Sequence, residues 1–434
     1  DMGAVGLTHL VFLGEKTSLK TTLAATVLHQ WQEKIILEET DSTSTSYLET
    51  YNKNVTIGAS IHTQINTKLS AKSNVRTGLI YDQKFVSFVD STINLNTLTY
   101  DVGLNQKDDF GLAQVYAQFH HRFSDKTSGT IGVHGQMSTL SSSFAIEPRI
   151  GFKWQPHKRH SISVGSGMHS QMLPSLTYFY QTYLPVENRF TRTNRDLGFT
   201  RSVHAVLGYD WSVIPNLRVK LEGYYQYLYK VPVEPTASYF SMVNAGESIG
   251  DVSIRDSLVN KGTGENMGIE LTIEKFFNRG YYFLLAGSLY NATYQGSDGV
   301  KRNSAFNGNY NLSALGGYEF KISKKNTLAF DSKITWTGGA RHVPIDLDAS
   351  ITAQETVRDY SRAYEVRYKD YFRMDMKATF TFNGKRASHS LAFDFQNVFN
   401  TKNVFSEHFN SETGSIETKY QLGFLPLLYY RVEF

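Results

Sequence analysis

The sequence contains no cysteine, only 9 prolines and nearly balanced charge, with a formal net charge of +4 at pH 7. Without cysteine, a disulfide scaffold, a thiolate zinc site and a cysteine nucleophile are excluded. A net charge this small lacks the strong basic excess that nucleic-acid binders show. No apolar run approaches the roughly 18 residues of a transmembrane helix, and the mean hydropathy is −0.33. These absences exclude a disulfide-rich secreted domain and a helical membrane protein, and they give no support for a nucleic-acid binder.

What the sequence does contain is a large aromatic fraction, with 28 Phe, 27 Tyr and 4 Trp among 434 residues. That fraction excludes a disordered chain. Apolar and polar residues also alternate strictly in several segments, of which residues 372–382 are the clearest example. The same pattern occurs in residues 217–227, 269–274 and 388–396. A period of two indicates β-strands with one apolar and one polar face.

The length of the alternating segments distinguishes two architectures. In a soluble sandwich the apolar face packs against a second sheet, whereas in a membrane barrel it meets lipid and the polar face lines a wet interior. The alternation here persists for about 10 to 15 residues. Soluble strands usually have about 5–6 residues, and a tilted strand that crosses a bilayer needs about 9–11. Strand length and the aromatic residues near strand ends, such as Phe276, Phe277, Tyr225 and Tyr227, favour the barrel.

The connections between about 17 strand-like segments support the same interpretation, because short polar turns alternate with longer loops. The predicted short turns are Glu15–Ser18, Ser70–Asn74, Ser124–Thr127, Pro156–Arg159, Ile214–Asn216, Asn278–Gly280, Ser323–Asn326 and Asn383–Ser388. The predicted longer connections are Thr40–Thr45, Asp90–Asp109, Pro174–Asp196, Pro232–Asn260, Gly296–Asn307, Val343–Asp370 and Lys402–Thr418, with one tight link at Ser141–Ser143. Capped segments with sustained helical periodicity are missing, so the sequence predicts little helix.

The chain ends in an alternating segment that resembles the last strand of bacterial outer-membrane proteins, which the barrel-assembly machinery reads. Four residues lie on the apolar face of this segment: Leu428, Tyr430, Val432 and Phe434. Arg431 and Glu433 lie on the opposite face. The resemblance implies that the barrel-assembly machinery is a partner of this chain.

Longer motifs extend the resemblance to one family. Residues 268–320 include Gly268-Ile-Glu-Leu-Thr-Ile-Glu274 and Ala305-Phe-Asn-Gly-Asn-Tyr310, and a later segment contains Asp394-Phe-Gln-Asn-Val-Phe-Asn400. The end reads Tyr420-Gln-Leu-Gly-Phe-Leu-Pro426. Together these motifs resemble the C-terminal barrel of TonB-dependent outer-membrane receptors of the Bacteroidetes type. The likeness is dense over residues 200–434 and continues as a strand rhythm over residues 1–200.

The resemblance implies an all-β fold, a transmembrane antiparallel barrel of which about 17 of 22 strands are present. It implies one barrel domain over residues 1–434 in the outer membrane of a Gram-negative bacterium, surrounded by its lipids. No segment resembles a signal peptide or a plug, so the plug and the first strands are expected to be absent. In the family, the plug and the TonB complex drive the uptake of a large nutrient such as a ferric siderophore. No cofactor is expected.

Candidate ligand contacts lie in the predicted long loops, because ordered long loops usually have a function. Aromatic rings and arginines together suit an anionic, partly aromatic ligand. The alternative is that these rings belong to the outer aromatic girdle or pack the loop on itself. The candidates are Tyr178, Phe179, Tyr180, Tyr183, Phe190, Arg189, Arg192 and Arg195, with Tyr239 and Phe240. A weaker group contains Arg255, Tyr360, Arg362, Tyr364 and Arg367.

Charged residues on the polar faces of the strands are expected to face the lumen. They are Arg218, Lys220, Arg373, Asp375 and Lys377, and we expect them to pair with one another or to contact the plug. No metal site is expected, because His157 and His160 lie in a solvated turn, and His120 and His121 point to opposite faces of a strand. No catalytic motif is present, so an enzyme is not expected. A passive porin is the main alternative function, and a receptor for binding and signalling, or one paired with a surface lipoprotein, is the third.

Overall fold

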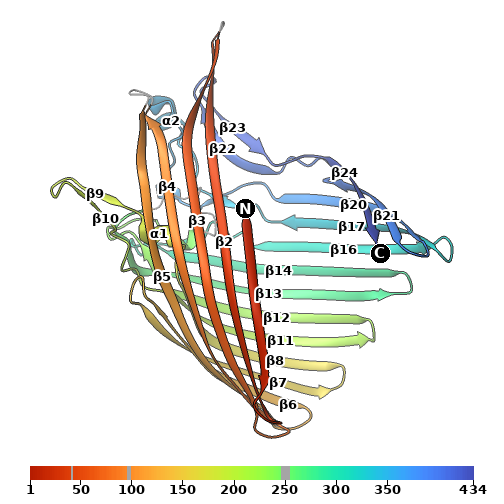
Figure 1. The fold of residues 1–434 in the computed structure, drawn as a ribbon. Helices are drawn as coiled ribbons and strands as arrows, with labels where there is room; N and C mark the ends of the chain where they lie inside the picture. Colours follow the sequence, from red (N-terminus) through yellow and green to blue (C-terminus); the bar gives the residue numbers. More distant parts are fainter. Residues whose placement is uncertain (41–42, 95–98, 246–254) are drawn as a thin grey trace.

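The structure is a computed structural model, and it describes residues 1–40, 43–94, 99–245 and 255–434 (Figure 1). Most of the described chain lies in one antiparallel sheet of 18 strands. Seventeen of them form the wall, which agrees with the predicted number, and the other is β15 (Lys301–Asn303), which pairs only with β14. The wall strands are β1 (Met2–Phe12), β2 (Thr17–Thr40), β3 (Thr43–Lys68), β4 (Ser73–Asn94), β5 (Thr99–Arg122), β6 (Thr127–Ser138), β7 (Phe144–His157), β8 (His160–Gln171), β11 (Thr200–Ile214), β12 (Leu217–Val233), β13 (Val259–Asn278), β14 (Tyr281–Gln295), β16 (Tyr310–Lys321), β17 (Asn326–Thr337), β20 (Tyr371–Asn383), β21 (Ser388–Gln396) and β24 (Leu425–Glu433).

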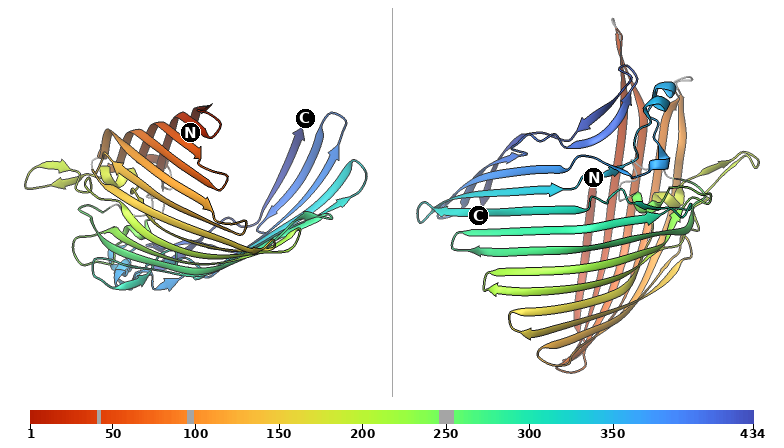
Figure 2. Two further views of the ribbon diagram at one scale, coloured as in Figure 1. Left: turned by 90° about the horizontal axis from the view of Figure 1, so that it is seen from below. Right: turned by 180° about the vertical axis from the view of Figure 1, so that it is seen from behind.

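Each wall strand pairs with the wall strand that precedes it and the one that follows it along the chain. Within the described residues, β1 and β24 each pair with one neighbour, and they form the two edges of the sheet. The sheet curls into an open trough whose N-terminal and C-terminal edges stand apart (Figure 2). The right-handed twist of paired strands accounts for the curl.

Short elements lie in the connections between wall strands. Two helices, α1 (Ser175–Phe179) and α2 (Leu347–Ala353), and two 3₁₀ turns, η1 (Met242–Asn244) and η2 (Tyr360–Arg362), confirm the small helix content. Three two-stranded sheets are β9 (Thr182–Leu184) with β10 (Arg189–Thr191), β18 (Arg341–His342) with β19 (Val366–Arg367), and β22 (Val404–Asn410) with β23 (Ser415–Tyr420). In the described residues, no helix is long and apolar enough to cross a membrane.

The eight short turns occur where the sequence predicts them, and they lie along one rim of the sheet, which runs from the bottom to the right of Figure 1. The long connections lie at the opposite rim, and the link after β6 is tight, as predicted. Two predicted loops are mostly strand. The pairing of β4 with β5 continues from Asp90 opposite Leu104 to Asn94 opposite Thr99, and β2 pairs with β3 up to Thr40. The sequence does not predict strand there, because polar residues at these strand ends obscure the alternation of apolar and polar residues. Residues 41–42 and 95–98 lie outside the described part.

The two faces of the wall differ as the alternation predicts. Apolar side chains such as Leu79, Val115 and Ile269 lie on the outer, convex face, and 60% of Ile269 is exposed. The intervening residues, for example Arg218 and Asp375, lie on the inner face and form ion pairs. A large apolar outer face that no protein element covers matches a lipid environment, and a polar inner face matches a wet interior.

Candidate ligand-binding surface

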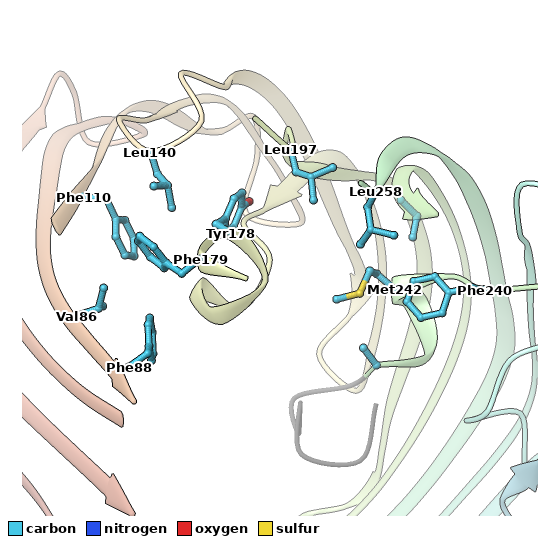
Figure 3. Packing of buried hydrophobic residues seen from close by; sticks show 12 residues of the cluster. Val86, Phe88, Phe110, Leu140, Tyr178, Phe179, Leu197, Phe240, Met242 and Leu258 are labelled. Carbon is cyan, nitrogen blue, oxygen red and sulfur yellow. The ribbon is translucent and has the colours of Figure 1, made fainter. Parts of the chain in front are cut away.

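The connection between β8 and β11 folds inward over the inner face of the wall. Its helix α1 places Tyr178 and Phe179 against β4 and β5, where Phe179 lies 5.7 Å from Phe88 and 6.2 Å from Phe110 between ring centroids (Figure 3). Both side chains are 0% exposed. The same apolar cluster, called here the loop core, also contains Leu140, Leu197, Val231, Phe240, Met242 and Leu258. It joins two long connections to the wall.

The loop core corrects part of the predicted ligand surface. Tyr178, Phe179 and Phe240 were expected to contact a ligand, but their buried rings pack the loops on the wall. Burial also raises the pKa of the Tyr178 hydroxyl to about 12. These three rings therefore differ from both expectations, because they pack against the inner face of the wall and against a second connection. Their partners Val86 and Phe88 lie on the inner face of β4, where an apolar residue breaks the alternation.

The other candidates of this connection are accessible to different degrees. Tyr183 and Phe190 form an exposed pair with ring centroids 5.2 Å apart on the β9–β10 hairpin, which projects away from the wall (Figure 1). Arg189 pairs with Glu187 at 2.5 Å on this hairpin, and Tyr180 is half-buried at the end of α1. Ligand contact at Tyr180, Tyr183 and Arg189 therefore stays a prediction.

The two remaining arginines of this connection have different surroundings. Arg192 lies 5.0 Å from the centre of the Phe179 ring and donates hydrogen bonds to Asp108 and Gln106 of β5, both at 2.5 Å. It therefore fastens the loop to the wall. The side chain of Arg195 is exposed and forms no ion pair or hydrogen bond with another described residue. Arg195 is thus the cation of this loop that remains available for an anionic ligand.

A second group of aromatic rings comes from two other long connections. Tyr239 stacks on Tyr360 with ring centroids 4.7 Å apart, and Tyr364 lies edge-on to Tyr294 at 5.9 Å. Burial, and then the neighbouring Tyr360, raise the pKa of Tyr239 to about 12. Tyr360 remains 45% exposed. Arg255 lies over the Phe240 ring at 5.7 Å and 3.6 Å from Glu234. The structure thus brings Tyr239 against Tyr360 and Arg255 over Phe240, two contacts that sequence spacing alone could not predict.

The last two cations of the weaker group are ion-paired. Arg362 pairs with Glu365 at 2.9 Å, and Arg367 lies 3.6 Å from Asp370. Both pairs join residues of the same connection. These two arginines therefore contribute to the surface of the connection but are less available than Arg195.

Sequence reasoning missed the residues that connect the last two long loops. His342 stacks on Tyr368 with centroids 3.9 Å apart, and its Nε2 lies 3.7 Å from Glu407. Arg358 donates to the carbonyl oxygens of Val343 at 2.8 Å and of Glu407 at 3.3 Å. Single charged and aromatic residues give no recognisable pattern, and the contacts join residues from 15 to 65 positions apart. Sequence spacing could not have found them.

Asparagines inside the quoted family motifs organise the loop bases. Asn307 is fully buried. Its Oδ1 accepts from the backbone N–H of Ala292 at 3.1 Å, and its Nδ2 donates to Asn291 at 2.9 Å and to Asn303 at 2.8 Å. Arg341 donates to the Asn307 carbonyl at 2.9 Å. These motifs are visible in the sequence as family signatures. Their asparagines hold the chain in place, through hydrogen bonds, beneath the exposed loop surface.

The predicted lumen residues do face inward, and they form pairs along the wall. Arg218 pairs with Asp210, Lys220 pairs with Glu222 at 2.5 Å, and Arg373 pairs with Asp375 at 2.7 Å. Lys377 lies 5.9 Å from the centre of the Tyr429 ring. Another inner-wall cluster, centred on Glu147, was not predicted. Glu147 is 2% exposed and accepts from Arg149 at 2.7 Å and from Gln136 at 2.8 Å.

The C-terminal residues form the edge strand β24. Leu428, Tyr430 and Phe434 are exposed, Val432 is half-buried, and the Tyr430 hydroxyl lies 2.8 Å from Nδ1 of His389. Their role in barrel assembly stays a prediction. His157 and His160 lie at a short turn with ring centroids 5.8 Å apart. In the parts of the chain that the structure describes, no group of three His, Asp or Glu side chains could hold a metal ion.

Comparison with known proteins gives one family. The family of TonB-dependent receptor-like β-barrels matches residues 13–398. No curated protein matches the chain. Among solved structures, the chain is similar to the ferric-catecholate import receptor Fiu of Escherichia coli K12 (TM-score 0.69, 10% identity, 99% of this chain and 63% of that one). It is also similar to the ferric yersiniabactin uptake receptor FyuA of Yersinia pestis (0.66, 10%, 100% and 61%) and to the copper transporter OprC (0.68, 11%, 99% and 65%).

These identities are low, so the similarities to solved structures concern the fold. The chain spans less than two thirds of the length of each of these three proteins. The exposed loop surface described above lies at the rim that carries the long connections.

Proposed function

We propose, from the premise that this chain belongs to the TonB-dependent receptor β-barrel family, that it forms the wall and outer loops of an importer for a ferric siderophore. The family places the protein in the Gram-negative outer membrane and consists of receptors and transporters rather than enzymes. In the proposed mechanism, the ligand binds at the long loops, and TonB, acting on a plug domain, drives its passage inward. We also propose the Bacteroidetes type, and a plug and further strands outside this chain.

The observation that carries the proposal is the family match over residues 13–398 together with long connections that fold as one surface. The loop core holds two connections on the inner wall, and the Tyr239–Tyr360 stack joins a third. Exposed Arg195 and half-exposed Tyr360 supply a cation and a π face. Both suit a large anion that carries aromatic rings, such as a ferric catecholate. The names of two similar structures, which refer to ferric-catecholate and ferric-yersiniabactin uptake, support this ligand class.

The test uses the complete receptor gene in a strain that lacks other iron receptors. Binding of a ferric catecholate to the purified protein is measured beside Cu²⁺ and an oligosaccharide. We expect binding of the catecholate, and a loss of about tenfold in affinity for Tyr360→Ala and for Arg195→Gln, since each removes roughly 1–2 kcal/mol. Tyr318→Ala is the matched control, because Tyr318 is an exposed aromatic residue of β16 near the short-turn rim, away from the long connections. Binding of Cu²⁺ or the sugar alone would refute the siderophore proposal.

The porin alternative makes a different prediction. A porin conducts ions across a planar bilayer without TonB, whereas a receptor closed by a plug does not. The coding sequence upstream of Asp1 is the first observation to make. A plug and a TonB-contacting segment there support the importer, and an intact signal peptide directly before Asp1 favours the porin.

A further inference from the structure

The short turns carry an unusual concentration of positive charge. Seven of the eight turns contain an exposed lysine or arginine, and only the turn at residues 215–216 has none. These residues, called here the turn cations, are Lys16, Lys72, Lys126, Lys158, Arg159, Arg279, Lys324, Lys325, Lys385 and Arg386. The same turns contain two acidic residues, Glu15 and Asp125. The small net charge of the chain therefore conceals a strongly basic rim.

The turn cations are not neutralised by the protein. None of them forms an ion pair with another described residue. Several cations at the opposite rim are paired, since Arg302 pairs with Asp298 at 2.7 Å and Arg362 with Glu365 at 2.9 Å. Some side-chain cations within the wall are also paired, as Lys220 is with Glu222. The charge at the short turns is thus available to a partner outside this chain.

Aromatic residues fix the depth of the turn cations in the membrane. Phe123, Trp154, Phe320 and Phe382 lie on the outer face within a few residues of a short turn, and each is exposed, from 58% for Phe123 to 42% for Phe382. Exposed aromatic rings of this kind lie at the boundary between hydrocarbon and headgroups. Phe123 is the first residue of the turn after β5, and the turns after β16 and β20 begin two residues beyond Phe320 and Phe382. The turn cations therefore lie at the depth of the lipid phosphates.

We propose that the turn cations bind the anionic phospholipid headgroups of the periplasmic leaflet. The distribution of the cations favours lipid over a protein partner. They follow the whole rim from the β1–β2 turn to the β20–β21 turn (Figure 1), and a planar headgroup layer reaches all of these turns at once. A docking protein would contact a few adjacent turns. Lysine and arginine attract anionic headgroups over about a Debye length and donate hydrogen bonds to phosphate oxygens.

Two of the turn cations also border a pocket. Lys16 and Lys72 line a pocket of about 440 Å³ together with Lys68 and Arg122. Lys68 and Arg122 belong to the inner-face positions of β3 and β5, so this pocket opens toward the interior of the trough. The experiment therefore uses turns on the far side of the sheet, where the cations do not border this pocket.

The proposal is tested by electron paramagnetic resonance of spin-labelled lipids around the full chain, reconstituted in phosphatidylcholine. The fraction of immobilised label gives the association of phosphatidylglycerol relative to phosphatidylcholine. We expect a ratio of about two to five at ~50 mM salt, which falls toward one at ~0.5 M salt because exposed charges are then screened. The quadruple variant K324Q/K325Q/K385Q/R386Q should lower the ratio at low salt.

The matched control removes four exposed cations without an ion pair to another described residue from the opposite rim, in K261Q/K369Q/K402Q/K419Q. It changes the net charge equally, and it should leave the ratio unchanged. Equal ratios for wild type and the turn variant would overturn the proposal, and so would a wild-type ratio near one. In the second case, salt-sensitive binding of an acidic soluble protein through the same turns would assign them to a protein partner. The salt dependence of the wild type tests the proposal even if the variant does not fold.

Discussion

Single asparagines determine how the long connections leave the wall. The side chain of Asn307 satisfies four partners from a fully buried position, and Asn397, also buried, donates to the carbonyl oxygen of Thr401 at 3.0 Å. Asn397 and Asn400 adopt positive φ angles of 50° and 49°, which asparagine tolerates better than most residues. The family motifs in the sequence therefore mark folding sites beneath the loops, and the residues that could meet a ligand lie above them.

The substitution Asn307→Ala should destabilise the folded chain. It leaves a backbone N–H and two side-chain oxygens without their partner in a buried site, which costs about 2–3 kcal/mol. The midpoint of thermal unfolding in detergent, read from tryptophan fluorescence, measures the effect. Asn383→Ala, at an exposed turn, is the control and should change the midpoint little. An equal shift for both variants would contradict the role assigned to Asn307.

The stability of the last long connections should depend on pH through His342. Burial, and then the neighbouring Arg358 cation, lower the pKa of His342 below its ordinary value of 6.5. As pH falls below about 6.5, the unfolded chain takes up a proton before the folded chain does, so the stabilisation present above that pH is lost. The Glu407 carboxylate, 3.7 Å from Nε2, lies beyond hydrogen-bond distance and does not reverse the direction of this pKa shift.

The measurement is the thermal midpoint between pH 8 and pH 5. His342→Phe keeps a ring on Tyr368 but cannot be protonated, so it should remove part of the decline below pH 6.5. His157→Phe, at an exposed turn, should keep the full decline. If all three proteins give the same pH profile, His342 does not contribute to it.

At the scale of elements, the strands were easier to predict than the loops. A period of two and the turn residues located the wall strands and all eight short turns, because alternation and turn chemistry are local properties. The inward fold of the β8–β11 connection depends on Phe88 and Phe110, which are about 70 to 90 residues away from α1. An aromatic residue in a loop looks the same in sequence whether it meets a ligand or a buried wall. That is why Tyr178 and Phe179 were misplaced.

The helix α1 should lose its position when Phe179 is shortened. Phe179→Ala removes a fully buried ring from the loop core and should cost about 3–5 kcal/mol of the packing that holds this connection. Limited proteolysis within residues 182–191 should then become faster, while the wall keeps its thermal midpoint. Phe190→Ala, on the exposed hairpin, is the control and should leave cleavage elsewhere in the connection unchanged. Slow cleavage in Phe179→Ala would show that the loop core does not hold α1.

At the scale of the whole molecule, the polar mean hydropathy of the chain gives no sign of the apolar face that meets the membrane. Alternation divides each strand between an apolar convex face and a charged concave face, so neither mean hydropathy nor net charge describes either surface. The class of fold and the strand number followed from this division. The trough shape and the extension of β2 to β5 beyond the membrane could not follow from it, because they depend on twist and on pairing between polar strand ends.

The two faces of β13 should respond to the same substitution with losses of different size. Leu271 lies on the outer face and is 42% exposed, whereas Thr272 lies on the inner face beside Lys220 of β12. Leu271→Arg should cost about 2–4 kcal/mol near the bilayer midplane, and Thr272→Arg about 0–1. Unfolding by guanidinium in lipid vesicles measures both. A larger loss for Thr272→Arg would reverse the assignment of the faces.

Neighbours in the wall are also neighbours along the chain, and every second connection returns to the same rim. A duplication or deletion of one hairpin would therefore leave the direction of all other strands unchanged. The removal of a single strand would instead exchange the inside and outside ends of everything after it. Over evolutionary time, a wall built in this way can grow or shrink in steps of two strands. The long connections and the short turns then stay on their separate rims.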